Sequence, residues 1–368
     1  MEYVSTRGSA PALDFEGVTL AGLAADGGLY VPREWPRFSE GEIAAMAGLS
    51  YVELAVKVMQ PFVGDSLTEE ELRDLCTRAY GRFAHEAVTP LRQFDQQHWL
   101  LELFHGPTLA FKDVALQLLG RLFETFLGRS GQRLTIVGAT SGDTGSAAID
   151  AVAGRSNIDI FMLHPKGRVS DVQRRQMTTV LDDNVHNIAL EGTFDDCQDA
   201  VKAMFNNHAF RDRVRLSGVN SINWGRIVAQ IVYYFTAAVS LGAPQRKVSF
   251  TVPTGNFGDI FAGYCARQMG LPIEKLVIAT NANDILKRAI DTGRYEMAGV
   301  APTISPSMDI QISSNFERLL FESVGRDAEA VNRMMAGLKQ SRGFDLPDTA
   351  IGAIRRDFAA GKTDEAAT

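Results

Sequence analysis

Lys112 is the first residue whose type and position suggest chemistry. It lies in the segment Leu100–Gln117, LLELFHGPTLAFKDVALQ, where an apolar run, a turn-prone His-Gly-Pro-Thr stretch and apolar residues at helical spacing predict strand, loop and helix. A lysine in the first turn of a helix faces the positive end of the helix dipole, and burial beside Phe111 and Val114 would also disfavour its charge. Both effects lower the lysine pKa and favour a neutral amine that can attack a carbonyl and form an imine. A solvated surface lysine is the ordinary alternative, because most lysines are exposed.

A second candidate is the polar loop from Thr140 to Gly145, which follows the β-rich run 134–137 and opens a predicted helix. Its glycines allow close approach of a ligand to the backbone, and the hydroxyls of Ser141 and Thr144 with the helix N–H groups can hold a carboxylate or phosphate. The loop matches neither the GK[ST] phosphate loop nor the GxGxxG dinucleotide motif. Taken alone, it is equally well explained as a tight turn with a hydroxyl cap.

The third candidate is a glycine-containing loop between the predicted strand 248–252 and a helix; it consists of Gly255, Asn256, Phe257, Gly258 and Asp259. Two glycines at the start of a helix suit a phosphate held by main-chain N–H groups. A plain strand-to-helix turn is again the alternative reading.

The fourth candidate enters a long helix predicted from Trp224 to about Leu241; its polar residues are Asn220, Ser221, Asn223 and Arg226. Amides, a hydroxyl and a planar guanidinium within seven residues form a suitable anion site, because arginine can bind phosphate with two hydrogen bonds. An Asn/Ser cap beside a solvated arginine is the reading that this stretch alone would favour.

Strands and helices alternate from about residue 134 onward, which predicts an α/β fold with a parallel sheet covered by helices. In such sheets ligands bind beyond the carboxyl ends of the strands, so we expect the loops to converge on one crevice. We predict a mostly helical N-terminal region over 1–95, an α/β domain over 96–215 and a second one over 216–368. The segment from Asp345 is expected to end in a fraying polar tail.

Composition restricts the function further. A net charge of −7 without a long basic run argues against nucleic acid as a partner. Cys76, Cys197 and Cys265 show no metal-binding or disulfide spacing and suggest reduced thiols in the cytoplasm. No apolar stretch has the length of a signal or membrane segment. The histidines show no metal-ligand spacing, and Ser141 lacks the GxSxG context of a serine hydrolase.

Four separated motifs carry a resemblance to a known family: FHGPTLAFKD, ATSGDTGSAA, NSIN with a following Arg, and PTGNFGD, in this order. Over essentially its whole length the chain resembles the threonine synthases, pyridoxal-phosphate enzymes of the tryptophan-synthase-β fold. The resemblance implies two parallel-sheet α/β domains and a carbon–oxygen lyase with pyridoxal 5'-phosphate as its cofactor. It also implies that the chain lacks a C-terminal segment that family members have.

The resemblance assigns a role to each motif. Lys112, which follows Phe111 in the cofactor-binding motif, matches the lysine that holds the cofactor as an imine and later moves protons. The loop that wraps the cofactor phosphate is matched by Gly255, Asn256, Phe257 and Gly258, with Asp259 next to it. The loop facing the cofactor ring and the substrate carboxylate is matched by Thr140, Ser141, Gly142, Asp143 and Thr144. The site for the substrate phosphate is matched by Ser221, Asn223 and Arg226, together with Thr144.

The activity implied by the resemblance is conversion of O-phospho-L-homoserine and water to L-threonine and phosphate. A lyase that releases 2-oxobutyrate from the same substrate is the nearest alternative, and a catalytically inactive homologue is another. Neither a metal nor a membrane is expected to take part, and the chain is expected to act as a monomer or homodimer.

Overall fold

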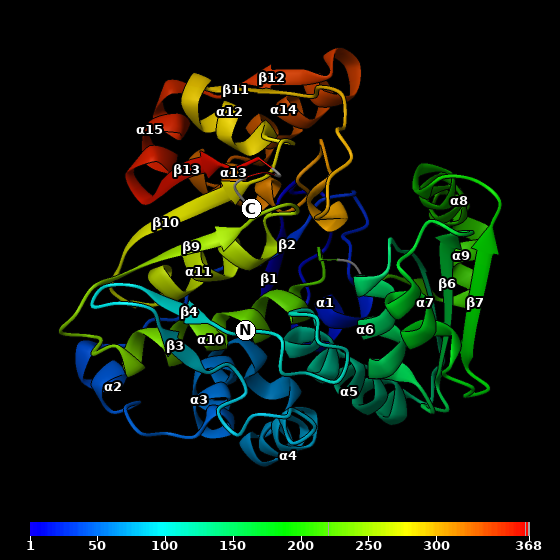
Figure 1. Cartoon of the computed structure of the whole chain (residues 1–368), viewed down its shortest axis with the longest axis horizontal. Helices are drawn as coiled ribbons and strands as arrows, with labels where there is room; N and C mark the ends of the chain where they lie inside the picture. The colour runs from blue at the N-terminus through cyan, green and yellow to red at the C-terminus, as the bar shows by residue number, and fades with distance from the viewer. Residues whose placement is uncertain (220, 365, 367–368) are drawn as a thin grey trace. The chain divides into compact units, whose positions relative to one another are not determined.

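The computed structural model describes residues 1–219, 221–364 and 366 (Figure 1). The chain forms two compact units, and each is built from stretches that are far apart in sequence. Unit 1 comprises Met1–Phe15, Leu23–Leu49 and Gln230–Thr368, and unit 2 comprises Glu16–Gly22 and Ser50–Ala229. The division into segments 1–95, 96–215 and 216–368 stays a prediction.

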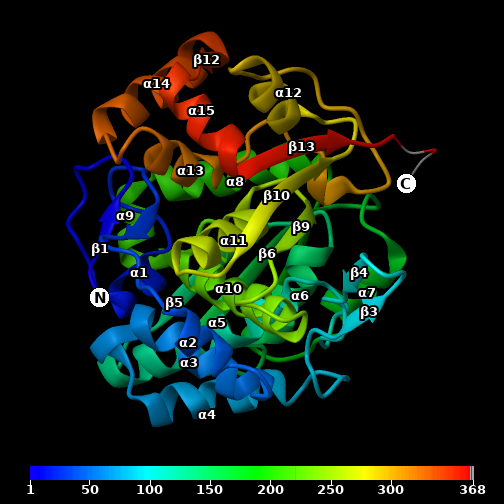
Figure 2. The same ribbon diagram turned by 90° about the vertical axis from the view of Figure 1, so that its left-hand side faces the viewer.

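Unit 1 contains a three-stranded parallel sheet in the order β13-β10-β9, whose neighbouring strands are labelled in Figure 2. Its strands are β9 (Val248–Pro253), β10 (Ile273–Thr280) and β13 (Phe358–Lys362). Leu276 in the central strand pairs with Phe250 on one side and Phe358 on the other. The strand predicted over 248–252 is β9, and its apolar, β-branched residues favour a strand.

The C-terminal segment corrects one prediction, because Gly361 and Lys362 at the start of the expected polar tail belong to a strand of the sheet. It forms helix α15 (Asp348–Asp357) and then β13, which closes one side of the sheet. Phe358 is buried and packs against Phe257 at a centroid distance of 5.7 Å. The strand FAAGK has little β-branched character, so its pairing with β10 could not be recognised locally.

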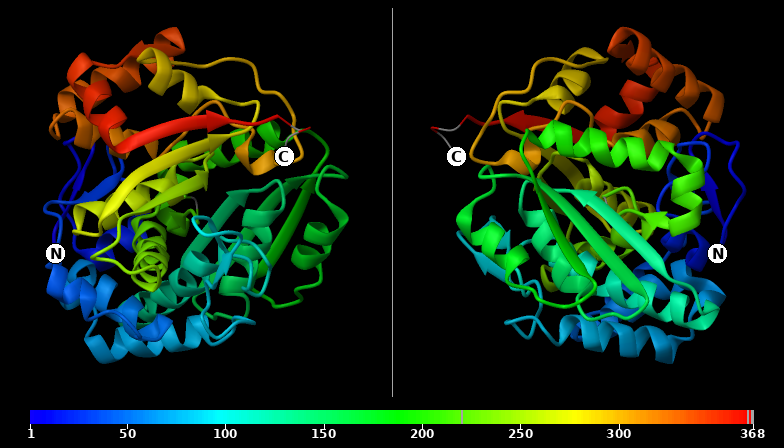
Figure 3. Two further views of the ribbon diagram at one scale, coloured as in Figure 1. Left: turned by 60° about the vertical axis from the view of Figure 1, so that its left-hand side comes forward. Right: turned by 90° about the vertical axis from the view of Figure 1, so that its right-hand side faces the viewer.

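Unit 2 contains a four-stranded parallel sheet in the order β7-β6-β5-β8. The longer strands are adjacent arrows in the right-hand view of Figure 3. Their bounds are β5 (Leu134–Ala139), β6 (Ile158–Pro165), β7 (Val185–Leu190) and β8 (Leu216–Ser217). The parallel α/β fold predicted from the sequence is therefore confirmed.

Helix α5 (Asp113–Ser130) packs closely against helix α6 (Asp143–Val152) in unit 2. The contact requires Gly120, because a Cβ atom there would lie 2.3 Å from the carbonyl oxygen of Ala151. Leu116, Leu119 and Phe123 on α5 belong to the buried cluster shared with α6 and the sheet, and the other members of that cluster include Ile136, Ile149 and Ile160. This packing fixes the starts of both helices, where the candidate residues lie.

Three early helices begin with capping boxes, in which a hydroxyl and a glutamate each satisfy a backbone N–H group. They are α2 (Glu40–Ala44), α3 (Tyr51–Val63) and α4 (Glu69–Tyr80), capped by Ser39, Ser50 and Thr68. The mostly helical character predicted for this region is confirmed. It also contains a two-stranded antiparallel sheet of β1 (Tyr3–Ser5) and β2 (Tyr30–Pro32).

The predicted strand before Lys112 is shorter than expected and differs in kind. β4 (Trp99–Leu101) ends before Phe104 and pairs antiparallel with β3 (Leu91–Gln93), so it is part of a hairpin and not of the parallel sheet. The other helices and strands are α1 (Phe15–Ala21), α7 (Asp171–Thr178), α8 (Phe194–Asn206), α9 (His208–Val214), α10 (Trp224–Ser240), α11 (Gly258–Gln268), α12 (Ile285–Thr292), β11 (Arg294–Glu296), α13 (Phe316–Ser323), α14 (Ala328–Ser341) and β12 (Gly343–Asp345). Within the described residues, no helix combines the length and the apolar character needed to cross a bilayer.

Candidate active site

Lys112 is the N-cap residue of α5 and is almost completely buried, with 8% of its surface exposed. Its Nζ atom lies 5.0 Å from the ring centroid of Phe111. The next residue, Asp113, is fully buried and accepts hydrogen bonds from the N–H (2.7 Å) and the hydroxyl (2.8 Å) of Thr108. Asp113 therefore ties the turn before the helix to the helix start. Burial raises the pKa of Asp113 to about 6.

The Lys112 amine forms an ion pair with the Asp143 carboxylate, and both side chains are largely removed from solvent. Burial lowers the pKa of the amine below its ordinary value, as expected from the sequence. Asp143 opposes that effect, and the positive charge of Arg226 adds to it. The amine is therefore closer to its neutral, nucleophilic form than a surface lysine would be.

Asp143 is the first residue of α6, where the helix dipole favours a carboxylate. Its Oδ1 atom accepts a hydrogen bond of 2.7 Å from the N–H group of Thr144. Burial alone would raise the pKa of this carboxyl, but Lys112, the Thr144 N–H group and Arg226 lower it below its ordinary value. The carboxylate is thus ionised at neutral pH and can hold a protonated Lys112.

The loop before α6 is organised by Thr140, which is buried. Its hydroxyl oxygen accepts 2.9 Å hydrogen bonds from the N–H groups of Gly142 and Gly145. Ser141 and Thr144 are half-buried in the same loop. These hydrogen bonds fix the backbone of the loop next to Asp143. Ser141 and Thr144 remain partly accessible to solvent.

Arg226 lies in the first turn of α10 and is 3% exposed. One of its Nη atoms donates to the carbonyl oxygen of Val219 at 2.9 Å, and its charge acts on both Lys112 and Asp143. Arg226 is therefore a buried cation near the ion pair, as an anion site would require.

Asn223 is fully buried, and its side chain is used inside unit 2. Its amide nitrogen donates to the carbonyl oxygen of Thr19, and its amide oxygen accepts from the Gly225 N–H, each at 2.9 Å. These bonds fix the entry to α10. Ser221 is half-buried beside it, and Asn220 lies outside the described residues.

The Gly255–Asp259 loop belongs to unit 1 and leads into α11. Phe257 has a left-handed backbone conformation (φ +65°) and is 1% exposed. Its ring packs against those of Phe316 and Phe358, at centroid distances of 5.4 and 5.7 Å. This aromatic packing holds a backbone conformation that a non-glycine residue seldom adopts.

The N–H groups of Asn256, Phe257 and Gly258 donate to no acceptor within the described residues. Buried N–H groups are usually hydrogen-bonded, and an unsatisfied one is costly. Three consecutive donors at the start of an eleven-residue helix form a suitable cradle for a phosphate group.

Asp259 directs its carboxylate into unit 1. The oxygen Oδ1 accepts hydrogen bonds from the hydroxyls of Tyr233 (2.5 Å) and Tyr234 (3.0 Å). Burial raises the pKa of Asp259, although the two hydroxyls act in the opposite direction. The Asp259 side chain therefore serves the packing of α10 and α11, and cofactor binding by Asp259 stays a prediction.

The structure brings together within unit 2 the ion pair, the Thr140–Thr144 loop and Arg226, while the Gly255–Asp259 loop belongs to unit 1. Sequence reasoning did not identify Asp113, Ser313 or Asn315. An aspartate in a first helical turn is too common to signal a special role. The other two contact the Gly255 loop from 58 and 59 residues away, so no local pattern could reveal them.

Comparison with known proteins assigns the family. The family model "Threonine synthase N terminus" matches residues 2–80, and "Pyridoxal-phosphate dependent enzyme" matches residues 83–339. A threonine synthase of Pseudomonas aeruginosa is 60% identical over 358 residues, which cover 97% of this chain and 76% of the relative. The chain belongs to the threonine synthase family.

Solved structures agree with that membership. A PLP-bound threonine synthase from Brucella melitensis matches with a TM-score of 0.97 and 62% identity over 99% of this chain and 78% of that one. A yeast threonine synthase matches with a TM-score of 0.94 and 45% identity over 99% and 77%. The chain is thus a pyridoxal-phosphate-dependent lyase that acts on a small molecule. The buried Lys112 amine suits an aldehyde. The three N–H groups that have no acceptor within the described residues suit a phosphate.

Proposed function

We propose that this chain converts O-phospho-L-homoserine and water to L-threonine and inorganic phosphate. The observation that carries the proposal is the buried Lys112 amine, whose pKa is lowered by burial, with Asp143 bonded to it and the cation Arg226 close by. Such a group suits repeated proton transfer at a substrate that carries a phosphate. Family membership supports the same reaction.

Bound pyridoxal phosphate supplies an electron sink that stabilises negative charge on substrate carbons. We assign Lys112, preceded by Phe111, to the cofactor aldehyde. The N–H groups of Asn256, Phe257 and Gly258 are assigned to its phosphate, with Gly255 before them providing a position without a side chain. These N–H groups need no rearrangement to donate to a phosphate oxygen, since they have no competing acceptor in the described part of the chain.

Proton transfer is assigned to the Nζ atom of Lys112. The neutral amine takes a proton from the α-carbon of the substrate, and its lowered pKa increases the neutral fraction at working pH. Asp143 then stabilises the protonated amine through the ion pair. The same amine returns a proton at a later step.

The substrate phosphate is assigned to Arg226, with Ser221 and Thr144 as hydroxyl donors. A buried guanidinium binds a dianion more strongly than an exposed one, because solvent screens the charge less. Asn223 supports this site by holding the entry to α10. Thr140 and Ser141 are assigned to the substrate carboxylate, Thr140 acting through the loop that it organises.

We also propose that the protein is cytoplasmic and binds no nucleic acid. Three free, buried cysteines suit a reducing compartment, and the net charge of −7 disfavours a polyanion. A monomer or homodimer is proposed for the oligomeric state, which sedimentation of the holoenzyme would measure.

The test is product analysis of the holoenzyme with O-phospho-L-homoserine. Threonine and phosphate should form in equal amounts. The Lys112→Ala variant should lose turnover by several orders of magnitude, because the group that moves the protons is removed. Lys247→Ala is a matched control, since Lys247 is exposed in a surface ion pair with Glu274.

Each alternative product has a defined meaning. Formation of 2-oxobutyrate in place of threonine would make the chain a phosphohomoserine lyase. Absence of phosphate release would make it an inactive member of the family. A Lys112→Ala protein with the wild-type rate would contradict the assignment of the catalytic amine.

A further inference from the structure

Two carbonyl oxygens of the Gly255–Gly258 loop, those of Gly255 and Asn256, accept hydrogen bonds from one segment of unit 1. The Ser313 hydroxyl donates to the carbonyl oxygen of Gly255 at 2.6 Å. Both the backbone N–H and the side-chain amide of Asn315 donate to the carbonyl oxygen of Asn256, each at 3.0 Å. Ser313 and Asn315 are themselves buried.

These bonds determine the direction of the loop's N–H groups. In a planar trans peptide the C=O of one residue and the N–H of the next point in opposite directions. Holding the Gly255 carbonyl toward Ser313 therefore turns the Asn256 N–H away from it. Holding the Asn256 carbonyl toward Asn315 likewise turns the Phe257 N–H away from Asn315.

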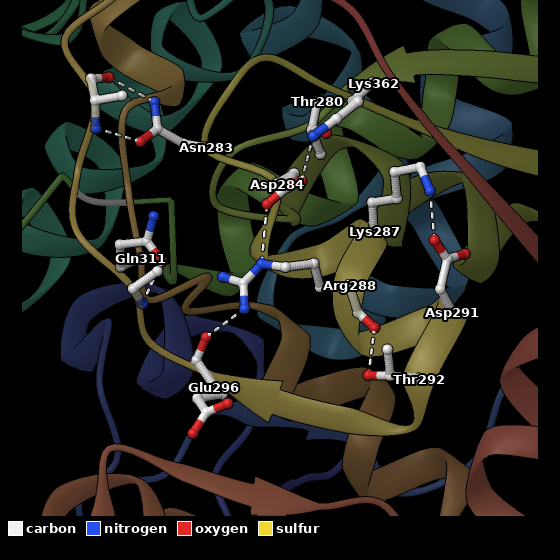
Figure 4. Close-up of polar contacts among 12 residues, drawn as sticks. Thr280, Asn283, Asp284, Lys287, Arg288, Asp291, Thr292, Glu296, Gln311 and Lys362 are labelled. Atoms are coloured by element: carbon white, nitrogen blue, oxygen red, sulfur yellow. Dashed lines mark hydrogen bonds and ion pairs between the residues drawn. The ribbon is translucent and has the colours of Figure 1, made fainter.

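The segment that carries Ser313 and Asn315 is fixed in turn. Asp309 accepts hydrogen bonds from the side-chain amides of Asn281 (2.8 Å) and Asn283 (2.9 Å), which follow β10. Figure 4 shows the Asn283 side chain, which bonds the backbone N–H and C=O of Ala301 at 2.9 and 2.8 Å. The segment is therefore held in place by hydrogen bonds that do not involve the Gly255–Gly258 loop.

Close packing also joins this segment to the loop. A Cβ atom at Gly255 would lie 3.1 Å from the carbonyl oxygen of Ser307 and 3.2 Å from the Cα atom of Met308. A glycine is needed at this position for the loop to approach the segment so closely.

Arg318 selects the orientation of the Asn315 amide. It is fully buried and donates to the Asn315 amide oxygen and to the carbonyl oxygen of Tyr30. With its oxygen taken by the guanidinium, the Asn315 amide must present its nitrogen to Asn256. Burial lowers the pKa of Arg318 to about 9, so the group remains a cation at neutral pH.

We propose that Ser313 and Asn315 are positioning residues, which orient the N–H groups of the Gly255–Gly258 loop toward the cofactor phosphate. The inference rests on the proposed function of that loop. Neither side chain needs to touch the cofactor, because each acts through a carbonyl on the opposite side of the same peptide plane.

Two substitutions separate this role from general stability. Ser313→Ala removes only the hydroxyl donor. Asn315→Asp keeps the acceptor for Arg318 but replaces the amide donor by an oxygen that repels the Asn256 carbonyl. Ser323→Ala and Asn332→Asp are matched controls, because these side chains also donate to backbone oxygens (Leu320 and Arg7) but do not bond the loop.

The experiment titrates cofactor-free protein with pyridoxal phosphate and with pyridoxal, which has the same ring and aldehyde but no phosphate. We expect Ser313→Ala and Asn315→Asp to weaken pyridoxal phosphate about tenfold or more, which is the effect of losing one well-placed hydrogen bond. Pyridoxal affinity should change less than twofold. Both controls should match the wild type, and a cooperative thermal transition for every variant should show that all of them are folded.

Two results would overturn the proposal. The first is wild-type affinity of Ser313→Ala for pyridoxal phosphate, even with a weakened Asn315→Asp, because the new charge alone would explain the latter. The second is an equal loss for both ligands, which would show a general defect. Turnover is not the readout, so the two proposals fail separately: missing product in the wild type contradicts the reaction, and unchanged affinities in the variants contradict the positioning role.

Discussion

The Lys112–Asp143 ion pair predicts that substitution of Asp143 destabilises the protein when Lys112 is present and does not when Lys112 is replaced. The side chains are 10% and 23% exposed, so neither charge is well hydrated. Asp143→Asn leaves a buried ammonium with Arg226 nearby and no carboxylate bonded to it. Removing one partner of a buried pair costs about 3–5 kcal/mol. We expect the lower end, about 3 kcal/mol, because Asp143 keeps some contact with solvent.

The loss should depend on pH, since Lys112 can escape the penalty by releasing its proton. A lysine whose folded-state pKa is lowered destabilises the protein at low pH, and stability returns as the pH rises from the folded pKa toward the unfolded value. The substitution removes the main group that raises the Lys112 pKa, so it lowers the folded pKa further. The difference from wild type should be largest at low pH and should decrease as the pH rises toward the ordinary lysine pKa, by at most about 1.4 kcal/mol per pH unit.

The assay is thermal unfolding of cofactor-free protein between pH 6 and pH 9 for wild type, Asp143→Asn, Lys112→Met and the double variant. A loss of 3 kcal/mol corresponds to roughly 6–12 °C for a body of 150–250 residues. In the Lys112→Met background Asp143 has lost the amine that it pairs with, so Asp143→Asn should be neutral or stabilising there. The reversal of sign measures the coupling directly.

One pattern would refute the reasoning. If Asp143→Asn costs the same at every pH and the same cost persists beside Lys112→Met, Asp143 acts by capping α6 and not through the lysine. The helix dipole alone accounts for about 0.3–1 kcal/mol of such a constant loss.

Two further predictions concern packing and buried charge, both measured by thermal unfolding. Glu317→Gln should lower the free energy of unfolding by about 3 kcal/mol, because the 3.0 and 3.1 Å bonds to Arg7 are largely buried. High salt should reduce this loss only slightly. A loss below about 0.5 kcal/mol would contradict the prediction. Gly120→Ala should cost about 1–3 kcal/mol, since its Cβ would collide with the Ala151 carbonyl at 2.3 Å. Gly128→Ala on the same helix meets nothing within 4 Å and should stabilise by up to about 1 kcal/mol; equal effects at the two sites would be inconsistent with the packing.

Much of the fold could be predicted from local pattern. The predicted runs 134–137 and 248–252 became β5 and β9 to within a few residues, and the long helix predicted from Trp224 is α10. These predictions were correct because the residues of each segment themselves favour the structure in which the segment packs. The hairpin strand β4 and the C-terminal strand β13 could not be classified, because each depends on a partner strand and not on its own composition.

The site residues stay predictions, but each of them lies in a short motif with a local physical reason. Lys112 is a cation in the wrong part of a helix, and the Gly255–Gly258 loop combines glycines with a helix start. Asp143 was placed in its loop by the sequence, but its ion pair with Lys112 spans 31 residues and needed the fold. The lowered pKa of the amine was expected in direction, although not the groups that balance it.

What the sequence could not supply is the set of groups that hold the reactive ones, because such groups are selected by the fold and not by neighbourhood in the chain. Asn223 reaches a carbonyl 204 residues away, and Ser313 reaches one 58 residues away. The Ser313 bond orients a peptide of the Gly255–Gly258 loop, whose N–H group on the other side we propose to bind the cofactor phosphate. A ligand-binding loop of this kind therefore depends on two sets of residues. One set presents the N–H groups, and the other consists of distant side chains that hold the opposite carbonyls. Substitutions in the second set should change ligand affinity without removing any contact to the ligand, which is why they are the more informative test of how this protein binds its cofactor.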